Sequence, residues 1–489
     1  MSRYYVTTSI PYVNGKPHIG HALELVQVDV LARHRRQRGD EVRAQSGTDD
    51  NALKNVHSAE AEGIGPAEYV AKAAERFVGL GEALEVGFDD FVRTSSDPRH
   101  APGVVKLWEA CAADFYRRSY TGLYCVGCEV FYRADELVGG ACPEHGTVPE
   151  AVTEDNWFFR LSHYQEALEK LVADDVVKVE PLSRKREVLS FIRSGLEDFS
   201  VSRSTDRARG WGIPVPGDPG QVVYVWFDAL ANYLTGPGYG TDDVGFRHWW
   251  EECPERVHVI GKGIIRFHAV YWLAMLLSAG IALPTTIFVH EYLTAGGRKI
   301  SKSEGNADDP VDVAARHGSD AVRWWLLSEV ARAGDTDFTE ERLVARANED
   351  LANNIGNLVN RTVSMIAKFG PAHGDDPGAT ALRSARAEAA ETVDRALAAF
   401  DFRRAVEAVT RIGDEANRYV QATKPWALAK QGSPDLPAVL GELLVTCREL
   451  AGHLTPFLPS AAARIVAQCD GAPISPVFPR LIGAQDVRT

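Results

Sequence analysis

The chain has 489 residues, enough for roughly two to four domains, and its 45% hydrophobic and 25% charged residues are typical of a globular protein. Its formal net charge of −14 argues against a nucleic-acid binder held by bulk positive charge, although local basic patches remain compatible with this balance. The longest apolar stretch, residues 269–283, is too short and too interrupted to span a bilayer, so we expect a buried helix there and no membrane partner.

A βαβ unit is predicted at the start of the chain. Residues 4–10 have the pattern of a buried strand, a loop with Pro and Gly covers 11–17, a helix runs from about 18 to 38, and a second strand covers 41–45. Because such units build parallel sheets, we expect ligands to bind outside the carboxyl ends of these strands. Apolar runs predict further buried strands at 222–227, 257–260 and 287–290.

The remaining segments predict an α/β fold followed by an all-α region. From about residue 341 the sequence has helical periodicity almost without strand signals, which predicts a helical bundle. We therefore expect a Rossmann-like parallel-sheet domain with an insertion, and then the bundle. The predicted boundaries are 1–115 and 161–290 for the two halves of the sheet domain, 116–160 for the insertion, 291–340 for a basic loop region and 341–489 for the bundle.

Three of the 7 cysteines lie close to a histidine in the predicted insertion. Cys125 and Cys128 form one pair, Cys142 and His145 form another, and thirteen residues separate the pairs. This spacing suits a tetrahedral Zn²⁺ site with three thiolates and one imidazole, and a full ligand set predicts a structural metal, one per chain. The alternative is a chance cluster of free cysteines.

The other four cysteines are scattered, unlike a secreted disulfide framework. The first predicted strand begins at residue 4, and no signal peptide precedes it. We therefore expect a reducing cytoplasm.

A possible phosphate-binding motif opens the first helix, where His18-Ile19-Gly20-His21 directly follows the strand and its loop. A helix N-terminus offers unpaired N–H donors and a positive dipole end, both suited to phosphate. The two histidines can donate to phosphoryl oxygens, and Gly20 leaves space for a planar base against the backbone. Taken alone, the motif is also compatible with two ordinary helix-start histidines.

A second motif lies far downstream, where the basic loop Gly296–Ser303 follows a predicted strand. Its lysines could neutralise a leaving pyrophosphate, although an exposed polar turn is the alternative. Together the two motifs resemble the HIGH and KMSKS signatures of class I aminoacyl-tRNA synthetases, with Ile300 where Met is usual. The resemblance implies ATP with its Mg²⁺ as a substrate. It implies catalytic roles for His18, His21, Lys299 and Lys302, and ATP contacts by Tyr12, Gly20, Glu24 and Lys302.

Three further segments are similar to the methionyl-tRNA synthetase family: residues 9–15, 226–233 and 260–268. The similarity covers essentially the whole chain and implies that the chain binds L-methionine and has methionine–tRNA ligase activity. The thioether tail of methionine hydrogen-bonds weakly, and its sulfur packs well on aromatic rings. For each aromatic residue alone, core packing is the alternative. The implied pocket residues are Ile10, Asp49 (which pairs with the substrate ammonium), Trp226, Ala229, Tyr233, Ile264, Phe267 and His268.

The chain departs from the family pattern at several positions. Asn51 and Ala52 stand where the family usually has His and Gly, Gly263 stands where it usually has Asp, and Leu273 replaces a common proline. The Gly263 change removes a charge near the expected reaction centre. A slower enzyme, an inhibitor-resistant paralog and a changed substrate choice all remain open.

Positions in the helical region resemble the anticodon-reading residues of the same family, namely Asn357, Arg361 and Trp426. Single-stranded bases are recognised by stacking on aromatic rings and by hydrogen bonds to their edges, so the resemblance implies tRNA(Met) with a CAU anticodon as partner. We expect a monomer. The alternatives are a class I paralog for another amino acid and a non-catalytic tRNA-binding protein. Retention of both histidines and both lysines of the two signatures favours an enzyme.

Overall fold

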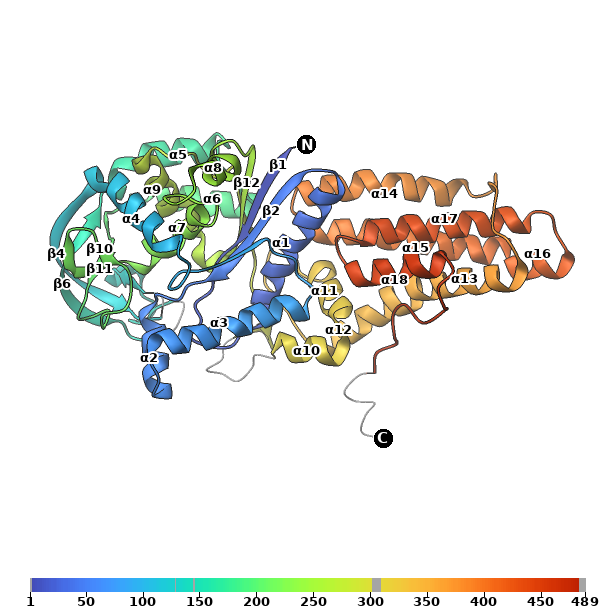
Figure 1. Ribbon diagram of the computed structural model, residues 1–489, viewed down its shortest axis with the longest axis horizontal. Helices are drawn as coiled ribbons and strands as arrows, with labels where there is room; N and C mark the ends of the chain where they lie inside the picture. The colour runs from blue at the N-terminus through green and yellow to red at the C-terminus, as the bar shows by residue number, and fades with distance from the viewer. Residues whose placement is uncertain (1, 128, 144–145, 301–308, 483–489) are drawn as a thin grey trace. The chain divides into compact units, whose positions relative to one another are not determined.

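The computed structural model describes residues 2–127, 129–143, 146–300 and 309–482, which form two compact units (Figure 1). The first unit contains residues within 1–17, 35–80 and 87–291, and the second contains residues within 18–34, 81–86 and 292–489.

A six-stranded parallel sheet forms the centre of the first unit, with the order β3-β2-β1-β12-β13-β7. Its strands β1, β2 and β12 are labelled in Figure 1. β1 (Arg3–Thr8) pairs with β2 (Glu41–Thr48) on one side and with β12 (Glu255–Gly261) on the other. On one side of β1 the chain adds β2 and then β3 outward; on the other side the edge strand β7 comes first in the sequence, and β12 and β13 later fill the positions between it and β1. The strand order therefore reverses between β1 and β12. Open parallel sheets bind ligands at such a switch point, outside the carboxyl ends of the strands. The remaining strands are β3 (Asp90–Arg93), β7 (Lys178–Glu180) and β13 (Thr286–His290).

Helices surround this sheet, and the predicted parallel α/β arrangement is confirmed. The apolar stretch predicted as a buried helix is a π-helical turn, Phe267–Tyr271, followed by α9 (Trp272–Ala279). Leu273, one of the departures from the family pattern, is fully buried on α9. The other helices of the unit are α2 (Leu53–Glu62), α3 (Pro66–Ala83), α4 (His100–Ala110), α5 (Gln165–Ala173), α6 (Leu182–Arg193), α7 (Val225–Thr235) and α8 (Asp243–Phe246).

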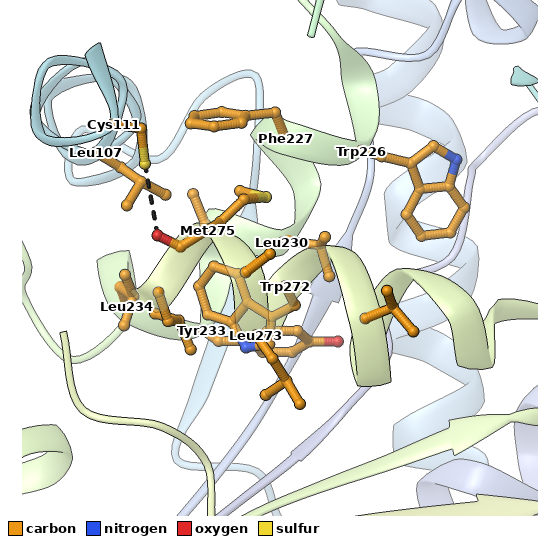
Figure 2. Packing of buried hydrophobic residues seen from close by; sticks show 14 of the residues in the cluster. Leu107, Cys111, Trp226, Phe227, Leu230, Tyr233, Leu234, Trp272, Leu273 and Met275 are labelled. Carbon is orange, nitrogen blue, oxygen red and sulfur yellow. Dashed lines mark hydrogen bonds between the residues drawn. The ribbon is translucent and has the colours of Figure 1, made fainter. Parts of the chain in front are cut away.

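The strand predicted over residues 222–227 is wrong in its second half, because β11 ends at Val223 and α7 begins at Val225. All 11 residues of α7 are buried, so the helix has no polar face and its apolar start cannot be told from a strand by periodicity. In Figure 2, Phe227 and Leu230 of α7 lie near Leu107, Cys111 and Met275, whereas the Trp226 side chain, a buried member of the same cluster, lies apart from these residues. The helix thus contributes to the core on one side and presents Trp226 on the other.

Two small antiparallel sheets lie between the halves of the parallel sheet in the sequence. One has the order β5-β4-β6-β8 and includes the predicted insertion, and the other has the order β10-β11-β9. Their strands are β4 (Phe115–Cys125), β5 (Val130–Tyr132), β6 (Glu150–Phe159), β8 (Phe199–Ser200), β9 (Ser202–Ser204), β10 (Pro214–Val215) and β11 (Asp218–Val223).

The second unit is mainly helical, as predicted for the C-terminal region. It includes most of α1 (Ile19–Gln37) and a small sheet of β14 (Leu293–Ala295), β15 (Arg298–Lys299) and β16 (Thr336–Asp337). α14, α15 and α17 run side by side and form the bundle (Figure 1). None of the helices in the described part of the chain is long and apolar enough to cross a membrane. The helices after α1 are α10 (Pro310–His317), α11 (Ser319–Ser328), α12 (Glu340–Arg346), a π-helix (Ala347–Gly356), α13 (Asn357–Phe369), α14 (Thr380–Ala398), α15 (Phe402–Thr423), α16 (Pro425–Gln431), α17 (Leu436–Leu454) and α18 (Pro459–Cys469).

A fully buried ion pair holds this second unit together. The Arg323 guanidinium of α11 donates to the Asp29 carboxylate of α1 at 2.7 Å, and neither side chain is exposed. The same guanidinium also donates to the carbonyls of Leu84, Pro456 and Phe457. One arginine therefore joins four separate segments of the chain.

Replacing Asp29→Asn should destabilise the protein by about 3–5 kcal/mol, because it leaves the Arg323 charge buried without its anion. The shift of the urea unfolding midpoint of this unit measures the loss. Glu407→Gln in the exposed pair with Arg403 is the control, and it should change stability by less than about 1 kcal/mol. Equal effects of the two substitutions would contradict this role of the buried pair.

Candidate active site

The predicted methionine-pocket residues all belong to the first unit. Five of the eight follow the carboxyl ends of its central strands, and the other three lie on α7. Ile10 and Tyr12 come after β1, Asp49 comes after β2, and Ile264, Phe267 and His268 come after β12. The loops after β1 and β2 are joined, since Tyr12 pairs with Asp49 as an isolated parallel bridge.

Gly47 of β2 allows β3 and the Ile10 side chain to approach β2 closely. A Cβ atom on Gly47 of β2 would lie 2.1 Å from the Val92 carbonyl oxygen and 3.0 Å from the Ile10 side chain. The sequence therefore needs glycine at this position for β3 and Ile10 to lie against β2.

Aromatic side chains form one wall of the site. The rings of Trp226 and Phe267 are stacked, with centroids 3.7 Å apart and an interplanar angle of 4°. Tyr12 meets Trp226 edge-on at a centroid distance of 6.1 Å. Ala229, one helical turn after Trp226 on α7, is buried. The structure thus brings residues that are more than 200 positions apart in the chain into one aromatic surface suited to an apolar, polarisable group.

A hydrogen-bonded chain fixes His268 next to this wall. Nδ1 of His268 lies 2.9 Å from the Ile264 carbonyl oxygen, which can only accept, so Nδ1 carries the hydrogen. Nε2 then accepts from the Tyr233 hydroxyl at 2.8 Å. Three predicted pocket residues are therefore connected.

A second buried histidine, His258, lies against Tyr233 at a ring-centroid distance of 4.1 Å. Burial, together with the neighbouring His268, lowers the pKa of His258 well below its usual value. The His258 imidazole beside the pocket is thus suited to remain neutral.

The Asp49 carboxyl group is the most perturbed acid of the site. It is 1% exposed, and among the described residues its Oδ1 atom has no hydrogen-bond partner, as is also true of the Tyr12 hydroxyl. Burial raises the Asp49 pKa well above its usual range, and the negative charges of Asp228, Glu129 and Asp50 raise it further. A cationic ligand group at Oδ1 would stabilise the ionised form of Asp49 and would give this oxygen a hydrogen-bond donor.

His18 and His21 belong to the second unit, at the start of α1, and their rings stack at 3.8 Å. The backbone N–H of His18 donates to Nδ1 of His21 at 3.0 Å, and that of Gly20 donates to Nδ1 of His18 at 3.1 Å. Both Nδ1 atoms accept, so the neutral rings carry their hydrogen on Nε2, the form that can donate to a phosphoryl oxygen. A Cβ atom on Gly20 would lie 3.0 Å from the His18 ring, and glycine thus keeps this stack in place. Glu24, the other predicted ATP contact on this helix, is buried.

The second signature is only partly described. Lys299 lies in β15 and Ile300 is buried, but Lys302 lies outside the described residues, within 301–308. Asp337 of β16 accepts from the backbone N–H of Gly297 at 2.8 Å and from the Thr294 hydroxyl at 2.9 Å. These bonds hold the turn from which the motif begins.

The predicted zinc ligands are described at two of four positions. Cys125 ends β4, the Cys142 carbonyl accepts from the backbone N–H of Gly146 at 2.8 Å, and both cysteines are buried. Cys128 and His145 lie outside the described residues. Among the residues that are described, no group of three or more His, Cys, Asp or Glu side chains is placed to hold a metal. Two buried thiols at turns fit a thiolate site, and the metal itself stays a prediction.

The predicted anticodon residues come together in the second unit. Asn357 opens α13 and is exposed, and Arg361 follows one turn later on the same helix. The Arg361 guanidinium lies 5.7 Å from the centroid of the Trp426 ring, which is 42% exposed. A half-exposed indole with a cation over it is a suitable platform for stacking a base.

Asp228, for which the sequence predicted no role, lies between Trp226 and Ala229 on α7 and is fully buried. Its carboxylate accepts from Asn51 at 2.7 Å and from His100 at 2.5 Å. The signal was present in the sequence, because a single charged residue within a buried apolar helix requires partners. Ala52, the neighbouring departure from the family pattern, is buried in the core.

Gly263 follows the end of β12 and is exposed, and nothing in its packing requires a glycine at this position. A carboxylate is nevertheless present at this edge of the sheet. Glu291, directly after β13, is buried and pairs with Arg184 at 2.5 Å and with Lys262 at 3.5 Å.

The sheet topology, the side chains gathered at the ligand edge of the sheet and the two signatures define a class I tRNA synthetase. The sequence model of the family described as tRNA synthetases class I (M) matches residues 4–147 and 145–363. A methionine–tRNA ligase of Brucella suis biovar 1 is 40% identical over 476 residues, which cover 95% of this chain and 91% of that protein. The chain belongs to the class I tRNA synthetases and, among them, to the methionine–tRNA ligases.

Solved structures agree with this assignment. Mycobacterium tuberculosis methionyl-tRNA synthetase in complex with methionyl-adenylate superimposes with a TM-score of 0.90 at 38% identity, covering 98% of this chain and 100% of that one. The apo form of the Mycobacterium tuberculosis enzyme gives a TM-score of 0.83 at 35% identity over 99% of each chain.

Replacing Asp49→Asn should stabilise the unliganded protein at neutral pH. The folded state raises the Asp49 pKa, so it binds the proton more tightly than the unfolded state does, and stability is lost as the pH rises above about 4. The variant does not lose this stability, so the difference in thermal midpoint between the variant and the unmodified protein should grow from pH 4 to pH 8.

Asp337→Asn is the control, and it should change the stability in the opposite direction. The backbone N–H of Gly297 and the Thr294 hydroxyl lower the Asp337 pKa, so its ionised form contributes stability above about pH 4 that the variant loses. A lower midpoint for Asp49→Asn at pH 8 would contradict the assignment of Asp49.

Proposed function

We propose that this chain activates L-methionine with ATP and transfers it to tRNA(Met), and that Asp49 binds the substrate ammonium. The observation that carries the proposal is the buried Oδ1 acceptor of Asp49, because Tyr12, the bridge partner of Asp49, meets Trp226 of the stacked Trp226–Phe267 pair edge-on. A cation at one end and an apolar, polarisable tail at the other are the two features of methionine that this pocket matches. Ile10, Ala229, Tyr233, Ile264 and His268 complete the proposed pocket.

The proposed first step forms methionyl-adenylate. A carboxylate oxygen of methionine bonds to the α-phosphorus of ATP while the bond from that phosphorus to the β-phosphate oxygen breaks, and pyrophosphate leaves with the electron pair. Such a transfer needs positioning and charge stabilisation rather than a covalent enzyme intermediate. Mg²⁺ carried by ATP would neutralise part of the phosphate charge.

Residues of the two signatures are proposed to act on the phosphates. The Nε2–H groups of His18 and His21 would donate to phosphoryl oxygens as charge develops, and Lys299 and Lys302 would stabilise pyrophosphate. Tyr12, Gly20 and Glu24 are proposed as ATP contacts. In the second step a ribose hydroxyl at the 3′ end of the tRNA attacks the methionyl carbonyl carbon, AMP leaves, and the hydroxyl proton is released.

Methionine-dependent exchange of labelled pyrophosphate into ATP, measured across all twenty amino acids, tests this function. We expect exchange with methionine only. Exchange with another amino acid instead would identify a paralog of different specificity. No exchange with any amino acid, combined with retained binding of tRNA, would identify a non-catalytic tRNA-binding protein.

Asn357, Arg361 and Trp426 are proposed to read the CAU anticodon. Replacing Trp426→Ala should leave methionine-dependent exchange unchanged, because the indole is proposed to contact only the tRNA. It should lower kcat/KM for charging by roughly tenfold to a hundredfold, the range expected from loss of one base stack. Val445→Ala, which removes an equally exposed apolar side chain of the same unit, is the control. Equal loss of exchange and charging in the Trp426 variant would contradict the anticodon role.

Cys125, Cys128, Cys142 and His145 are proposed to hold one structural Zn²⁺. Metal analysis of the purified protein should give about one zinc per chain, and Cys125→Ser should lose most of it, since a thiolate ligand is removed. Cys253→Ser, a buried cysteine outside this segment, should keep the metal. Full zinc content in the Cys125 variant would refute the site.

The cytoplasm is the proposed location, because ATP and tRNA are the substrates. The monomeric state and the domain boundaries stay predictions.

A further inference from the structure

The buried Asp228 carboxylate joins three segments of the first unit. Its Oδ2 atom accepts from the side-chain amide of Asn51 at 2.7 Å, and its Oδ1 atom accepts from Nε2 of His100 at 2.5 Å. Asp228 and His100 have no exposed surface. Both oxygens of a desolvated carboxylate are thus held by donors from separate parts of the chain, which is the arrangement that a buried charge requires.

The contact with His100 depends on the close packing of two helices. His100 opens α4, and Gly103 lies one turn later, where an added Cβ atom would be 2.4 Å from the Thr235 side chain and 2.7 Å from the Tyr239 carbonyl oxygen. Because glycine occupies this position, α4 lies directly against the C-terminal part of α7. His100 can then bond to Asp228 at one ring nitrogen and to the Thr235 hydroxyl, at 2.9 Å, with the other.

The contact with Asn51 connects α7 to the segment that carries the ammonium-binding carboxylate. Asn51 comes two residues after Asp49, and Asp228 comes two residues after Trp226. The backbone carbonyls of Asp49 and Asp50 are held in turn by the Asn55 side chain at 3.0 and 2.9 Å. The Asn51–Asp228 bond is therefore a direct side-chain link between the segment of Asp49 and the helix that carries Trp226.

We infer that Asp228 is a positioning residue for methionine recognition, which fixes Asp49 relative to the aromatic wall of α7 through its bonds to Asn51 and His100. This inference rests on the proposed function, since it assumes that Asp49 and Trp226 hold the two ends of one methionine. Asp228 acts through its partners and does not touch the substrate. The distance between the ammonium site and the thioether site determines which amino acids fit, and a small misplacement in such a site is costly.

The test changes the donor at residue 51 and leaves Asp49, Trp226 and Asp228 in place. Asn51→Asp keeps the shape of the side chain but replaces the amide group that donates to Asp228 with a carboxylate that can only accept. It should therefore raise the KM for methionine in pyrophosphate exchange roughly tenfold to a hundredfold. The KM for ATP should change by less than about threefold, because the link lies at the amino-acid end of the site. Asn51→His restores an N–H donor and should recover most of the methionine affinity.

Asp90→Asn is the matched control, because it removes a partly buried carboxylate that binds Arg43 and Arg99, which both donate to the Gly236 carbonyl at the far end of α7. It should affect stability without raising the KM for methionine selectively. Asn51→Ala gives a second variant without added charge repulsion. Methionine binding followed by the intrinsic fluorescence of the tryptophans gives a readout independent of catalysis.

The outcomes separate the inference from the function on which it rests. Absence of methionine-dependent exchange in the unmodified protein would overturn the proposed function. Exchange in the unmodified protein, together with an unchanged methionine KM in both Asn51→Asp and Asn51→Ala, would overturn the positioning role. Equal increases of the methionine and ATP KM values in the folded Asn51 variants would also overturn it, since a general structural defect would then explain the loss.

Discussion

The unsatisfied, buried carboxyl oxygen of Asp49 is the constraint on which the site depends. Burying an acid without a partner is unfavourable, and here three other carboxyl groups add to the cost. The surrounding fold maintains this arrangement, because Asp49 N donates to the Pro11 carbonyl and the Asn55 side chain holds the Asp49 carbonyl. Such a local conflict is expected where a ligand supplies the missing interaction.

The sheet topology explains why this carboxyl group has an aromatic neighbour. β1 is flanked by β2 and β12, so the loops that follow these three strands meet at one edge. Asp49 leaves β2, Phe267 follows β12, and Trp226 comes from the buried helix α7, which packs on the core with its other side (Figure 2). The polar and apolar ends of the pocket thus come from different segments, and their spacing needs a connection such as the one through Asp228.

Much of the fold could be predicted from local sequence patterns. The structure confirms the strands at residues 257–260 and 287–290, the first helix and the C-terminal bundle. These elements could be predicted because each has a clear periodicity or length in the sequence. The helix α7 was partly mistaken for a strand because a wholly buried helix has no polar face. The prediction of β2 ended too early, at residue 45 instead of Thr48, because Ser46 and Gly47 are poor strand formers that are kept for the close approach of β3 and Ile10.

The candidate pocket was predicted mainly through family resemblance, and the physics of its residues became clear only in three dimensions. No sequence pattern shows that Asn51 and His100 share one carboxylate, because these residues are far from Asp228 in the chain. The tautomers of His18, His21 and His268 likewise depend on which backbone groups lie next to each ring nitrogen.

Calorimetry of methionine binding in buffers with different ionisation enthalpies tests the central claim most directly, because it counts the protons released on binding. Asp49 has a raised pKa when no ligand is bound, and an ammonium group at Oδ1 would lower it, so binding should release protons at pH values between the lowered and the raised pKa. Asp49→Asn should bind methionine far more weakly. Tight binding without proton release at every pH from 5 to 8, or unchanged affinity in the Asp49 variant, would contradict the account.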